Sequence, residues 1–347
     1  MTELVFIGGI GKIDEFGGEL SKNKLIISRL CQAGARVIAV DTNGARKNIF
    51  KLLILPFKLM RNPNTPVIFS TSFGNIRTIS SLVRRVFRNR PLVLWVIGGT
   101  LHKQLESGEY TLRDLSVFDR IFVESVGMKD SLRSQGVKNV YYVPNFKDMT
   151  YSDVCRKQHS RSELRCVFFS RIEPLKGVNL IFETFEKGLL NEDKYIIDFF
   201  GPIKEDYKEQ FNKRISSHPN MNYRGVLNFF DGSAQKLLTD YDIALFPTLW
   251  PGEGFPGVIV DSYSVGLPVL ASDWNHNSEF VIDKERFMFE TGNVEEFAKK
   301  INWIYDNKSS LSDYSKKCKD ESKRFDVKNV ITEDFISQYI VLNKANY

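Results

Sequence analysis

The chain has 347 residues, of which 42% are hydrophobic and 26% charged. These proportions are those of a folded globular protein and exclude disordered and fibrous classes. The length is enough for two domains, each with its own core. No apolar run approaches the roughly 20 residues of a membrane-spanning helix, and a strand-like run begins at Leu4, where a signal peptide would need a basic region. We therefore expect a cytoplasmic protein.

The net charge of +6 is unevenly distributed along the chain. Residues 1–150 hold 22 Lys and Arg against 12 Asp and Glu, whereas residues 151–347 hold 26 against 30. The 51–100 segment has no acidic residue and eight basic ones: Lys51, Lys58, Arg61, Arg77, Arg84, Arg85, Arg88 and Arg90. A solvated surface explains single charges but not this absence of acids.

This basic 51–90 region therefore predicts an anionic partner. Apolar residues interleave with its cations, which favours an anionic membrane surface and a peripheral location on the inner face of the cytoplasmic membrane. No nucleic-acid-binding motif accompanies the charge, so we expect no nucleic acid partner. The four cysteines, Cys31, Cys155, Cys166 and Cys318, lack metal-ligand spacing and indicate reduced thiols.

Short apolar runs alternate with helical patterns, which is the rhythm of a parallel sheet. We predict strands at 4–9, 36–41, 67–72, 92–98, 121–125 and 139–143, and a second series at 166–171, 196–200, 222–226, 243–247, 268–272 and 287–289. A polar stretch, 145–163, separates the two series. Helices are expected at 19–33, 294–307, 309–324 and 327–342. The fold class is therefore α/β, with two Rossmann-like doubly wound domains facing a central cleft, and ligands are expected at the carboxyl ends of the strands.

The residues from Phe246 to Asp261 combine a buried strand, a Gly/Pro-rich turn and a helix start. Pro256 stands where a first helical residue is expected. The free N–H groups of such a start suit a phosphate, and Glu253 and Asp261 on either side suit sugar hydroxyls. Phosphate and sugar together indicate a sugar nucleotide.

Two cations follow the first strand of the second series. Arg171 and Lys176 lie at its carboxyl end, where a guanidinium and an ammonium together match a diphosphate. Taken alone they read as ordinary surface residues, but the Glu253 turn at the same sheet edge favours the functional interpretation.

Glycines also surround the first predicted turn, at Gly8, Gly9, Gly11, Gly17 and Gly18. They permit close backbone approach to a ligand. A dinucleotide fingerprint would need a further glycine where Asp14 stands. A dehydrogenase with Asp41 as its ribose-binding acid is therefore the weaker reading.

Two further features have competing interpretations. Asp240-Tyr241-Asp242 resembles a metal-binding D-x-D triplet, but it precedes a buried strand, so we interpret Asp242 as a junction residue and expect no metal cofactor. His102 follows a predicted strand end. It is either structural or in contact with the transferred sugar.

These residues together resemble glycosyltransferase family 4, the retaining GT-B enzymes also called glycosyl transferases group 1. The resemblance spans nearly the whole chain and is strongest from 165 to 275. It depends on Gly17-Gly18, Arg171 with Lys176-Gly177, Gly201-Pro202, Glu253-Gly254-Phe255-Pro256 and Gly266-Leu267-Pro268-Val269. One departure is that Asp261 stands where the family has a second glutamate, which puts donor affinity and nucleotide preference in question.

The resemblance implies an acceptor-binding domain at 1–150, a nucleotide-sugar-binding domain at 151–325 and a final helix, 326–347, returning to the first domain. It implies a metal-independent hexosyltransferase that moves a sugar from a nucleoside-diphosphate sugar, UDP favoured, to a glycan or lipid-linked acceptor of a cell-surface polysaccharide. The implied catalytic residues are Glu253, Arg171, Lys176 and His102. The implied donor-binding residues are Gly17, Gly18, Gly201, Gly254, Phe255, Pro256 and Asp261.

Two other functions fit the same pattern. A sugar-nucleotide epimerase of this fold would need only the donor. A non-catalytic sugar-nucleotide or glycan-binding subunit would also explain the shortened acid at Asp261.

Overall fold

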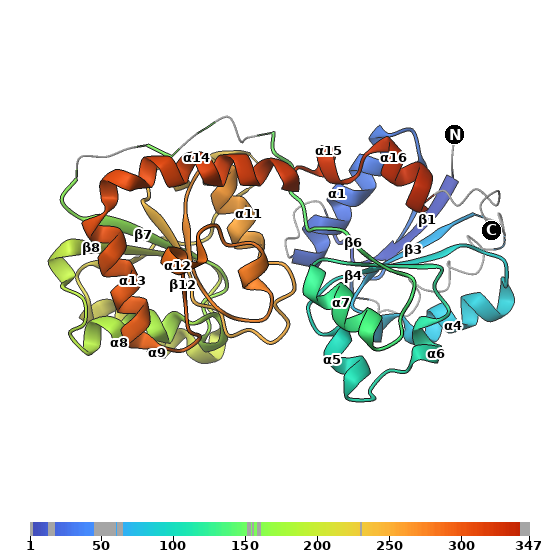
Figure 1. Ribbon diagram of the computed structural model, residues 1–347, viewed down its shortest axis with the longest axis horizontal. Helices are drawn as coiled ribbons and strands as arrows, with labels where there is room; N and C mark the ends of the chain where they lie inside the picture. Colours follow the sequence, from blue (N-terminus) through green and yellow to red (C-terminus); the bar gives the residue numbers. More distant parts are fainter. Residues whose placement is uncertain are drawn as a thin grey trace. The chain divides into compact units, whose positions relative to one another are not determined.

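The computed structural model describes residues 3–12, 18–44, 60, 65–150, 154, 156–157, 161–229 and 231–340 (Figure 1). By internal contacts the chain divides into two compact units. The first unit comprises the residues up to Asp148, the segment Gly252–Phe255 and the residues from Phe325 on. The second unit comprises Met149–Pro251 and Pro256–Arg324.

The first unit contains a six-stranded parallel sheet with the order β2-β1-β3-β4-β5-β6. Its strands are β1 (Glu3–Gly8), β2 (Arg36–Asp41), β3 (Val67–Thr71), β4 (Leu92–Val96), β5 (Arg120–Val123) and β6 (Val140–Tyr142). The central strands β3 and β4 are buried along their whole length, as expected for a parallel sheet covered on both faces.

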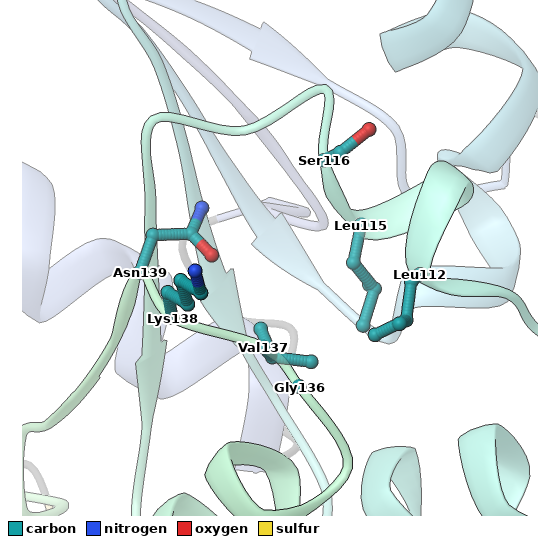
Figure 2. Close-up of a pocket in the computed structure, with 7 residues that line it drawn as sticks. All are labelled: Leu112, Leu115, Ser116, Gly136, Val137, Lys138 and Asn139. Atoms are coloured by element: carbon teal, nitrogen blue, oxygen red, sulfur yellow. The ribbon is translucent and has the colours of Figure 1, made fainter.

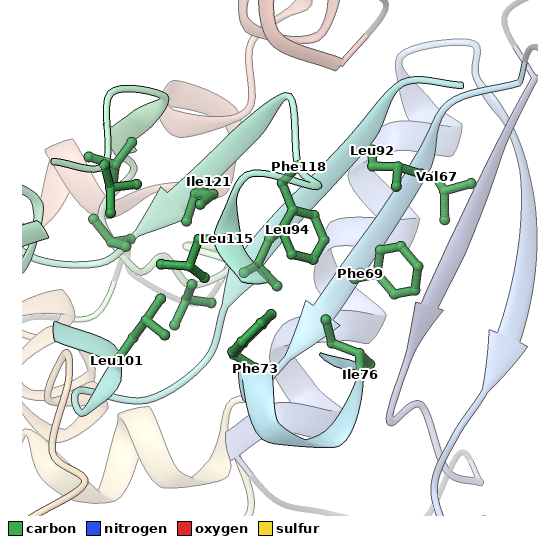
Figure 3. Close-up of a cluster of buried hydrophobic side chains, with 14 of the residues drawn as sticks. Val67, Phe69, Phe73, Ile76, Leu92, Leu94, Leu101, Leu115, Phe118 and Ile121 are labelled. Carbon is green, nitrogen blue, oxygen red and sulfur yellow. The ribbon is translucent and has the colours of Figure 1, made fainter. Parts of the chain in front are cut away.

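Each face of this sheet carries its own layer of helices. The helices α4 (Arg77–Val86), α5 (Leu101–Glu106), α6 (Leu112–Leu115) and α7 (Val126–Ser134) cover one face. The core beneath them includes Phe69, Leu94, Phe118 and Ile121 (Figure 3). The opposite face packs against α1 (Gly18–Gln32) and the last described residues of the chain (Figure 1).

The chain after Phe325 belongs to the first unit. Ile331, Ile336 and Ile340 are buried in the same apolar cluster as Trp95 and Phe122. The segment contains α15 (Val327–Val330), α16 (Glu333–Phe335) and a π-helical turn, Ile336–Ile340. The prediction of one helix over 327–342 was therefore wrong in its continuity. The chain breaks at Thr332, whose hydroxyl accepts a hydrogen bond from the N–H of Phe335 at 3.1 Å.

The second unit repeats the plan of the first, with the strand order β12-β11-β10-β7-β8-β9, all parallel. Its strands are β7 (Leu164–Phe169), β8 (Tyr195–Phe200), β9 (Met221–Tyr223), β10 (Ile243–Phe246), β11 (Val269–Ser272) and β12 (Met288–Phe289). Its helices are α8 (Val178–Glu186), α9 (Lys208–Ser217), α10 (Ser233–Leu238), α11 (Gly257–Ser264), α12 (Lys284–Phe287), α13 (Val294–Asp306) and α14 (Leu311–Ser322).

All twelve predicted strands are present, displaced by at most three residues at an end. The predicted helices at 19–33, 294–307 and 309–324 correspond to α1, α13 and α14, and Gly34 ends the first with a φ of 81°. Among the described residues, no helix is both long enough and apolar enough to cross a lipid bilayer.

Candidate active site

Arg171 stands two residues beyond the end of β7, at the carboxyl edge of the second sheet. Its side chain is half exposed, and the guanidinium lies 3.2 Å from the carboxylate of the buried Glu173. The backbone beside it is crowded, since a Cβ at Gly201 would overlap the carbonyl oxygen of Ser170. Gly201 has a φ of 139°, and its N–H donates to the carbonyl of Gly225 at 2.8 Å. The predicted donor-binding Gly201 therefore has a structural reason to be glycine.

Lys176 ends a short 3-10 turn, η2 (Pro174–Lys176), and is 8% exposed. Gly177 follows with a φ of 79°, and a Cβ there would overlap the carbonyl oxygen of Pro247. The loop after β10 therefore packs directly on this turn. A hydrogen bond of 2.8 Å from the N–H of Leu249 to the carbonyl of Leu175 joins the two segments.

Arg171 and Lys176 meet at one aromatic ring, that of Trp250. The guanidinium carbon of Arg171 lies 4.7 Å from the ring centroid, and Nζ of Lys176 lies 5.5 Å from it. The structure thus brings the two predicted diphosphate-binding cations together, and Trp250 is a member of the cluster that sequence reasoning missed. Trp250 follows the end of β10, the neighbour of β7 in the sheet, and that position at the same sheet edge was the available signal.

The helix α11 begins one residue later than predicted. Pro256 is its N-cap, with a ψ of 100°, and Gly257 is the first helical residue. No side chain among the described residues caps this start, so its first N–H groups are oriented for an anion. Asp261 lies on the second turn of α11 and is half-buried.

The turn that contains Glu253 is grouped with the first unit. The N–H of Gly99 donates to the carbonyl of Gly252 at 3.2 Å. A Cβ at Gly254 would approach the carbonyl carbon of Gly98 to 2.9 Å, so Gly254 also has a structural reason to be glycine. Phe255 is 6% exposed, with its ring 5.2 Å from that of Phe325. Glu253 is half-buried in this turn.

The loop after β1 is held by a carboxylate. Oδ1 of Asp41 accepts hydrogen bonds from the N–H groups of Ile10, Gly11 and Asn43, at 2.9, 3.2 and 2.8 Å. Asp41 is therefore occupied in fixing the loop, which argues against the dehydrogenase reading. Gly17 lies outside the described residues.

Gly18, the first residue of α1, differs from the other glycines of the site. A Cβ placed on it would meet no described atom within 4 Å, and its φ is not positive. The described residues therefore impose no packing constraint that requires glycine at this position.

His102 is the second residue of α5 and is 8% exposed. Its backbone carbonyl accepts a hydrogen bond of 3.2 Å from Nε2 of Gln135. The side chain is therefore largely within the first unit. A sugar would have access to only a small part of it.

A buried ion pair at the carboxyl edge of the first sheet was not predicted. Lys22 of α1 donates to Glu124, which follows β5, and both side chains are 5% exposed. The ammonium lies 5.7 Å from the ring centroid of Trp95 and 5.5 Å from that of Phe146. The two residues are 102 positions apart, so no local sequence pattern predicts their contact.

Asp242 is a junction residue, as predicted. One oxygen of its carboxylate lies 2.6 Å from the guanidinium of Arg156, and the other accepts from the N–H of Arg165 at 2.9 Å. Asp240 pairs with Lys157 at 2.8 Å. Within the described ranges, no group of three or more His, Cys, Asp or Glu side chains is arranged to hold a metal ion.

A surface pocket lies elsewhere on the first unit (Figure 2). It is lined by Leu112, Leu115, Ser116, Gly136, Val137, Lys138 and Asn139. Ser116 and Asn139 precede β5 and β6, so the pocket is at the amino end of the strands. Ligands of such sheets bind at the carboxyl ends, and this pocket contains none of the predicted site residues.

Comparison with known proteins finds a family match in the second half of the chain. The sequence model of the family described as "Glycosyl transferases group 1" matches residues 156–324, which is most of the second unit. A curated relative is the UDP-Gal:alpha-D-GlcNAc-diphosphoundecaprenol alpha-1,3-galactosyltransferase of Escherichia coli. It is 26% identical over 137 residues, which are 39% of this chain and 34% of that protein. The match thus spans about a third of the curated relative.

Solved glycosyltransferase structures resemble the chain over nearly its whole length. Anabaena Alr3699/HepE in complex with UDP and glucose has a TM-score of 0.72 at 16% identity, covering 97% of this chain and 98% of that one. Sucrose-phosphate synthase from Thermosynechococcus elongatus has a TM-score of 0.76 at 12% identity, with the same coverage. The chain therefore has the two-domain α/β fold of GT-B glycosyltransferases, and its residues 156–324 carry the sequence pattern of glycosyl transferases group 1.

Proposed function

We propose that the protein is a retaining glycosyltransferase that moves a hexose from a UDP-sugar to a glycan or lipid-linked acceptor. The observation that carries the proposal is the cationic cluster of Arg171 and Lys176 at the carboxyl edge of the second sheet. Two clustered cations suit a diphosphate leaving group. The uncapped start of α11, at the same sheet edge, offers N–H groups to the same anion.

The relatives favour uridine as the base and a lipid-linked acceptor. The name of the Escherichia coli relative gives UDP-Gal as donor and a diphosphoundecaprenol-linked sugar as acceptor. The Anabaena protein has been solved with UDP and glucose. We extend a UDP-sugar donor and a lipid-linked acceptor from those proteins to this one.

In the proposed reaction the bond between the anomeric carbon and the diphosphate oxygen breaks, and the acceptor oxygen bonds to the same face of that carbon. The acceptor's proton passes to the departing phosphate oxygen, and the acceptor attacks directly, so no enzymic nucleophile is needed. The two cations take the place of a metal cofactor at the diphosphate. Arg171 and Lys176 neutralise the diphosphate as negative charge develops on it. Glu253 orients the sugar hydroxyls, and Asp261 holds the ribose.

Backbone and histidine groups complete the proposed site. The N–H groups of Gly254 and Phe255, which precede Pro256, bind the phosphates, and Gly17 and Gly18 are proposed as further donor-binding residues. His102 contacts the transferred sugar through the small part of its side chain that is exposed.

The decisive experiment replaces Lys176 with Ala. Loss of one preorganised cation at the leaving group should reduce transfer by about a hundredfold to a thousandfold. Transfer is measured with radiolabelled UDP-galactose and UDP-glucose and a GlcNAc-diphospholipid acceptor. The control is Lys187→Ala, which removes a half-exposed lysine of the same unit whose partner is Glu295. Turnover of Lys176→Ala at the wild-type rate would reject the proposal, and an epimerised donor formed without acceptor would replace it with the epimerase.

We also propose that the first unit docks on an anionic membrane, close to a lipid-linked acceptor. On α4 the side chains of Leu82 and Val86 are 59% and 61% exposed. Arg85 and Arg88 beside them are exposed, and no acidic side chain among the described residues pairs with either. Apolar side chains flanked by cations suit the headgroup boundary of a bilayer. The inner face of the cytoplasmic membrane presents such anionic lipids.

The other described cations of the basic 51–90 region have structural partners. Arg84 lies 2.6 Å from Asp119, Arg77 lies 2.9 Å from Asp114, and Arg90 is 1% exposed, with its Nε donating to the carbonyl of Thr65. Lys51, Lys58 and Arg61 lie outside the described residues. Charge reversal should therefore be confined to Arg85 and Arg88.

Sedimentation with vesicles tests the docking. Binding to phosphatidylglycerol vesicles should weaken in Arg85→Glu/Arg88→Glu, since each cation contributes about 1 kcal/mol near such a surface. It should also weaken in Leu82→Ser/Val86→Ser, because that variant removes the apolar side chains that enter the headgroup boundary. The control Val226→Ser removes an apolar side chain of the second unit that is 66% exposed. Equal binding of the wild type to neutral phosphatidylcholine vesicles would contradict the proposal.

A further inference from the structure

Trp250 is held firmly at the end of the loop after β10. Its backbone carbonyl accepts a hydrogen bond of 2.7 Å from Nε1 of Trp274, and its N–H donates to the hydroxyl of Thr248 at 3.2 Å. Thr248 is anchored in turn, because its backbone carbonyl accepts a hydrogen bond of 2.7 Å from the hydroxyl of Ser272. The indole is half-buried. The backbone that carries the indole is therefore held by the loop and by β11.

The indole ring is the element that the two cations share. Both the Arg171 guanidinium carbon, at 4.7 Å, and Nζ of Lys176, at 5.5 Å, lie within the roughly 6 Å at which a cation is attracted to an aromatic face. Tryptophan is the strongest aromatic partner for a cation. Two positive groups that repel each other are thus drawn to one surface.

An aromatic partner and a carboxylate partner differ in whether they use the N–H donors of the cation. A carboxylate forms charge-assisted hydrogen bonds and neutralises the cation, so it would compete with an incoming diphosphate. The indole attracts through its quadrupole and accepts no conventional hydrogen bond from the cation. The contact with the indole therefore uses no N–H donor of either cation.

We propose that Trp250 is a positioning residue that holds Arg171 and Lys176 together in the arrangement that binds the donor's diphosphate. The inference deepens the proposed function and rests on it for the identity of the ligand. Trp250 acts on the phosphates through the two cations. Its removal should therefore affect ligands in proportion to the phosphates they carry.

The test compares UDP with uridine, which lacks the diphosphate. Trp250→Leu should weaken UDP binding about tenfold and leave uridine binding unchanged, because only the cation–aromatic contacts are lost. Trp250→Phe keeps a weaker aromatic face and should lose about threefold. Affinities are measured by calorimetry for UDP and by ligand-observed NMR for uridine, on the full chain.

Trp303→Leu is the matched control. Trp303 lies on α13 of the same unit, is also half-buried, and carries the guanidinium of Arg286 at 5.3 Å from its centroid. It contacts none of the predicted site residues in any described interaction. Its loss should leave UDP affinity unchanged.

Two results would overturn the inference. The first is Trp250→Leu binding UDP as tightly as the wild type, and the second is equal loss of UDP and uridine, which would indicate a role in the loop alone. If the wild type binds no UDP, the proposed donor is wrong. Inorganic pyrophosphate, which needs the two cations and no base, then tests Trp250 by the same comparison of variants.

Discussion

The carboxyl edges of the two sheets are built from similar residues and differ in how their charges are balanced. At the edge of the first sheet, Lys22 is paired with the buried Glu124, and the carboxylate of Asp41 accepts three backbone N–H groups. At the edge of the second sheet, two cations converge on an uncharged ring, with one carboxylate beside them. The buried cation of the first edge is paired with a carboxylate, whereas both cations of the second edge share one aromatic ring. This difference teaches that burial of a cation is no sign of function by itself, and that the chemistry of its partner decides.

Breaking the buried pair of the first unit should have the largest effect on stability. Lys22→Met leaves the Glu124 carboxylate buried without its partner, which costs about 3–5 kcal/mol. The double variant Lys22→Met/Glu124→Leu removes both charges and should recover most of the loss. Chemical unfolding measures both variants.

The surface pair of Lys129 and Asp130, 3.2 Å apart, provides the control for this experiment. Lys129→Met should cost less than about 1 kcal/mol, because exposed ion pairs contribute little. A double variant as unstable as Lys22→Met would mean that packing, and not charge balance, is what the pair supplies.

A substitution at Gly177 tests how closely the loop after β10 packs on the turn that contains Lys176. Gly177→Ala places a methyl group against the carbonyl of Pro247 at a left-handed position, for a loss of about 2–4 kcal/mol of stability together with UDP affinity. Gly188 also has a positive φ, of 69°, but has open space around it. Gly188→Ala should therefore cost only the backbone strain, about 1–2 kcal/mol. Equal melting temperatures for the two variants would contradict the close packing of the loop on the turn.

The proposed contact of Asp261 with the ribose is tested through the affinity for UDP. Asp261→Ala should weaken UDP binding about tenfold, equivalent to 1.4 kcal/mol, and leave binding of 2′,3′-dideoxy-UDP unchanged. Asp261→Glu restores the acid that the family has at this position and shows by its UDP affinity whether the shorter side chain reaches the ribose. Calorimetry measures both variants, and equal losses for both nucleotides would remove Asp261 from the ribose site.

The smallest effect is expected from Glu19, at the edge of the first sheet. Burial raises the pKa of its carboxyl above the ordinary value, although hydrogen bonds from Thr71 and from the N–H of Gly9 lower it. The folded protein therefore holds the proton more tightly than the unfolded chain. The stability this contributes is present below the unfolded pKa and is lost as pH rises through the folded pKa.

Glu19→Gln removes this titration and keeps a hydrogen-bond acceptor in place. At pH 7 the variant should melt about 1–2 °C above the wild type, since small free-energy changes shift the melting temperature by that order. At pH 4 the difference should shrink, because the wild-type carboxyl is then largely protonated in both states. A difference that grows toward low pH would contradict the direction of the pKa shift.

The sequence predicts the strands well because each is a short apolar run bounded by turn residues, a local signal that needs no partner. It also places Arg171 and Lys176 at one sheet edge, because parallel topology fixes where strands end. It does not predict Trp250 beneath them or the contact of Lys22 with Glu124, since both depend on segments far apart in the chain. The break at Thr332 is missed for a different reason, since Val327, Ile331 and Phe335 keep helical spacing across it while the Thr332 hydroxyl accepts a backbone N–H.

The route of the chain has a consequence for how the protein is made and cut. The polypeptide passes from one unit to the other at 148/149, 251/252, 255/256 and 324/325. Neither unit is therefore a continuous stretch that a protease or an expression boundary can release whole. A fragment ending at Asp148 would leave Trp95 and Phe122 without the isoleucines that cover them. Such a fragment should aggregate until residues 325–340 are supplied in trans, which makes complementation of this kind a direct assay for the assembly of the first unit.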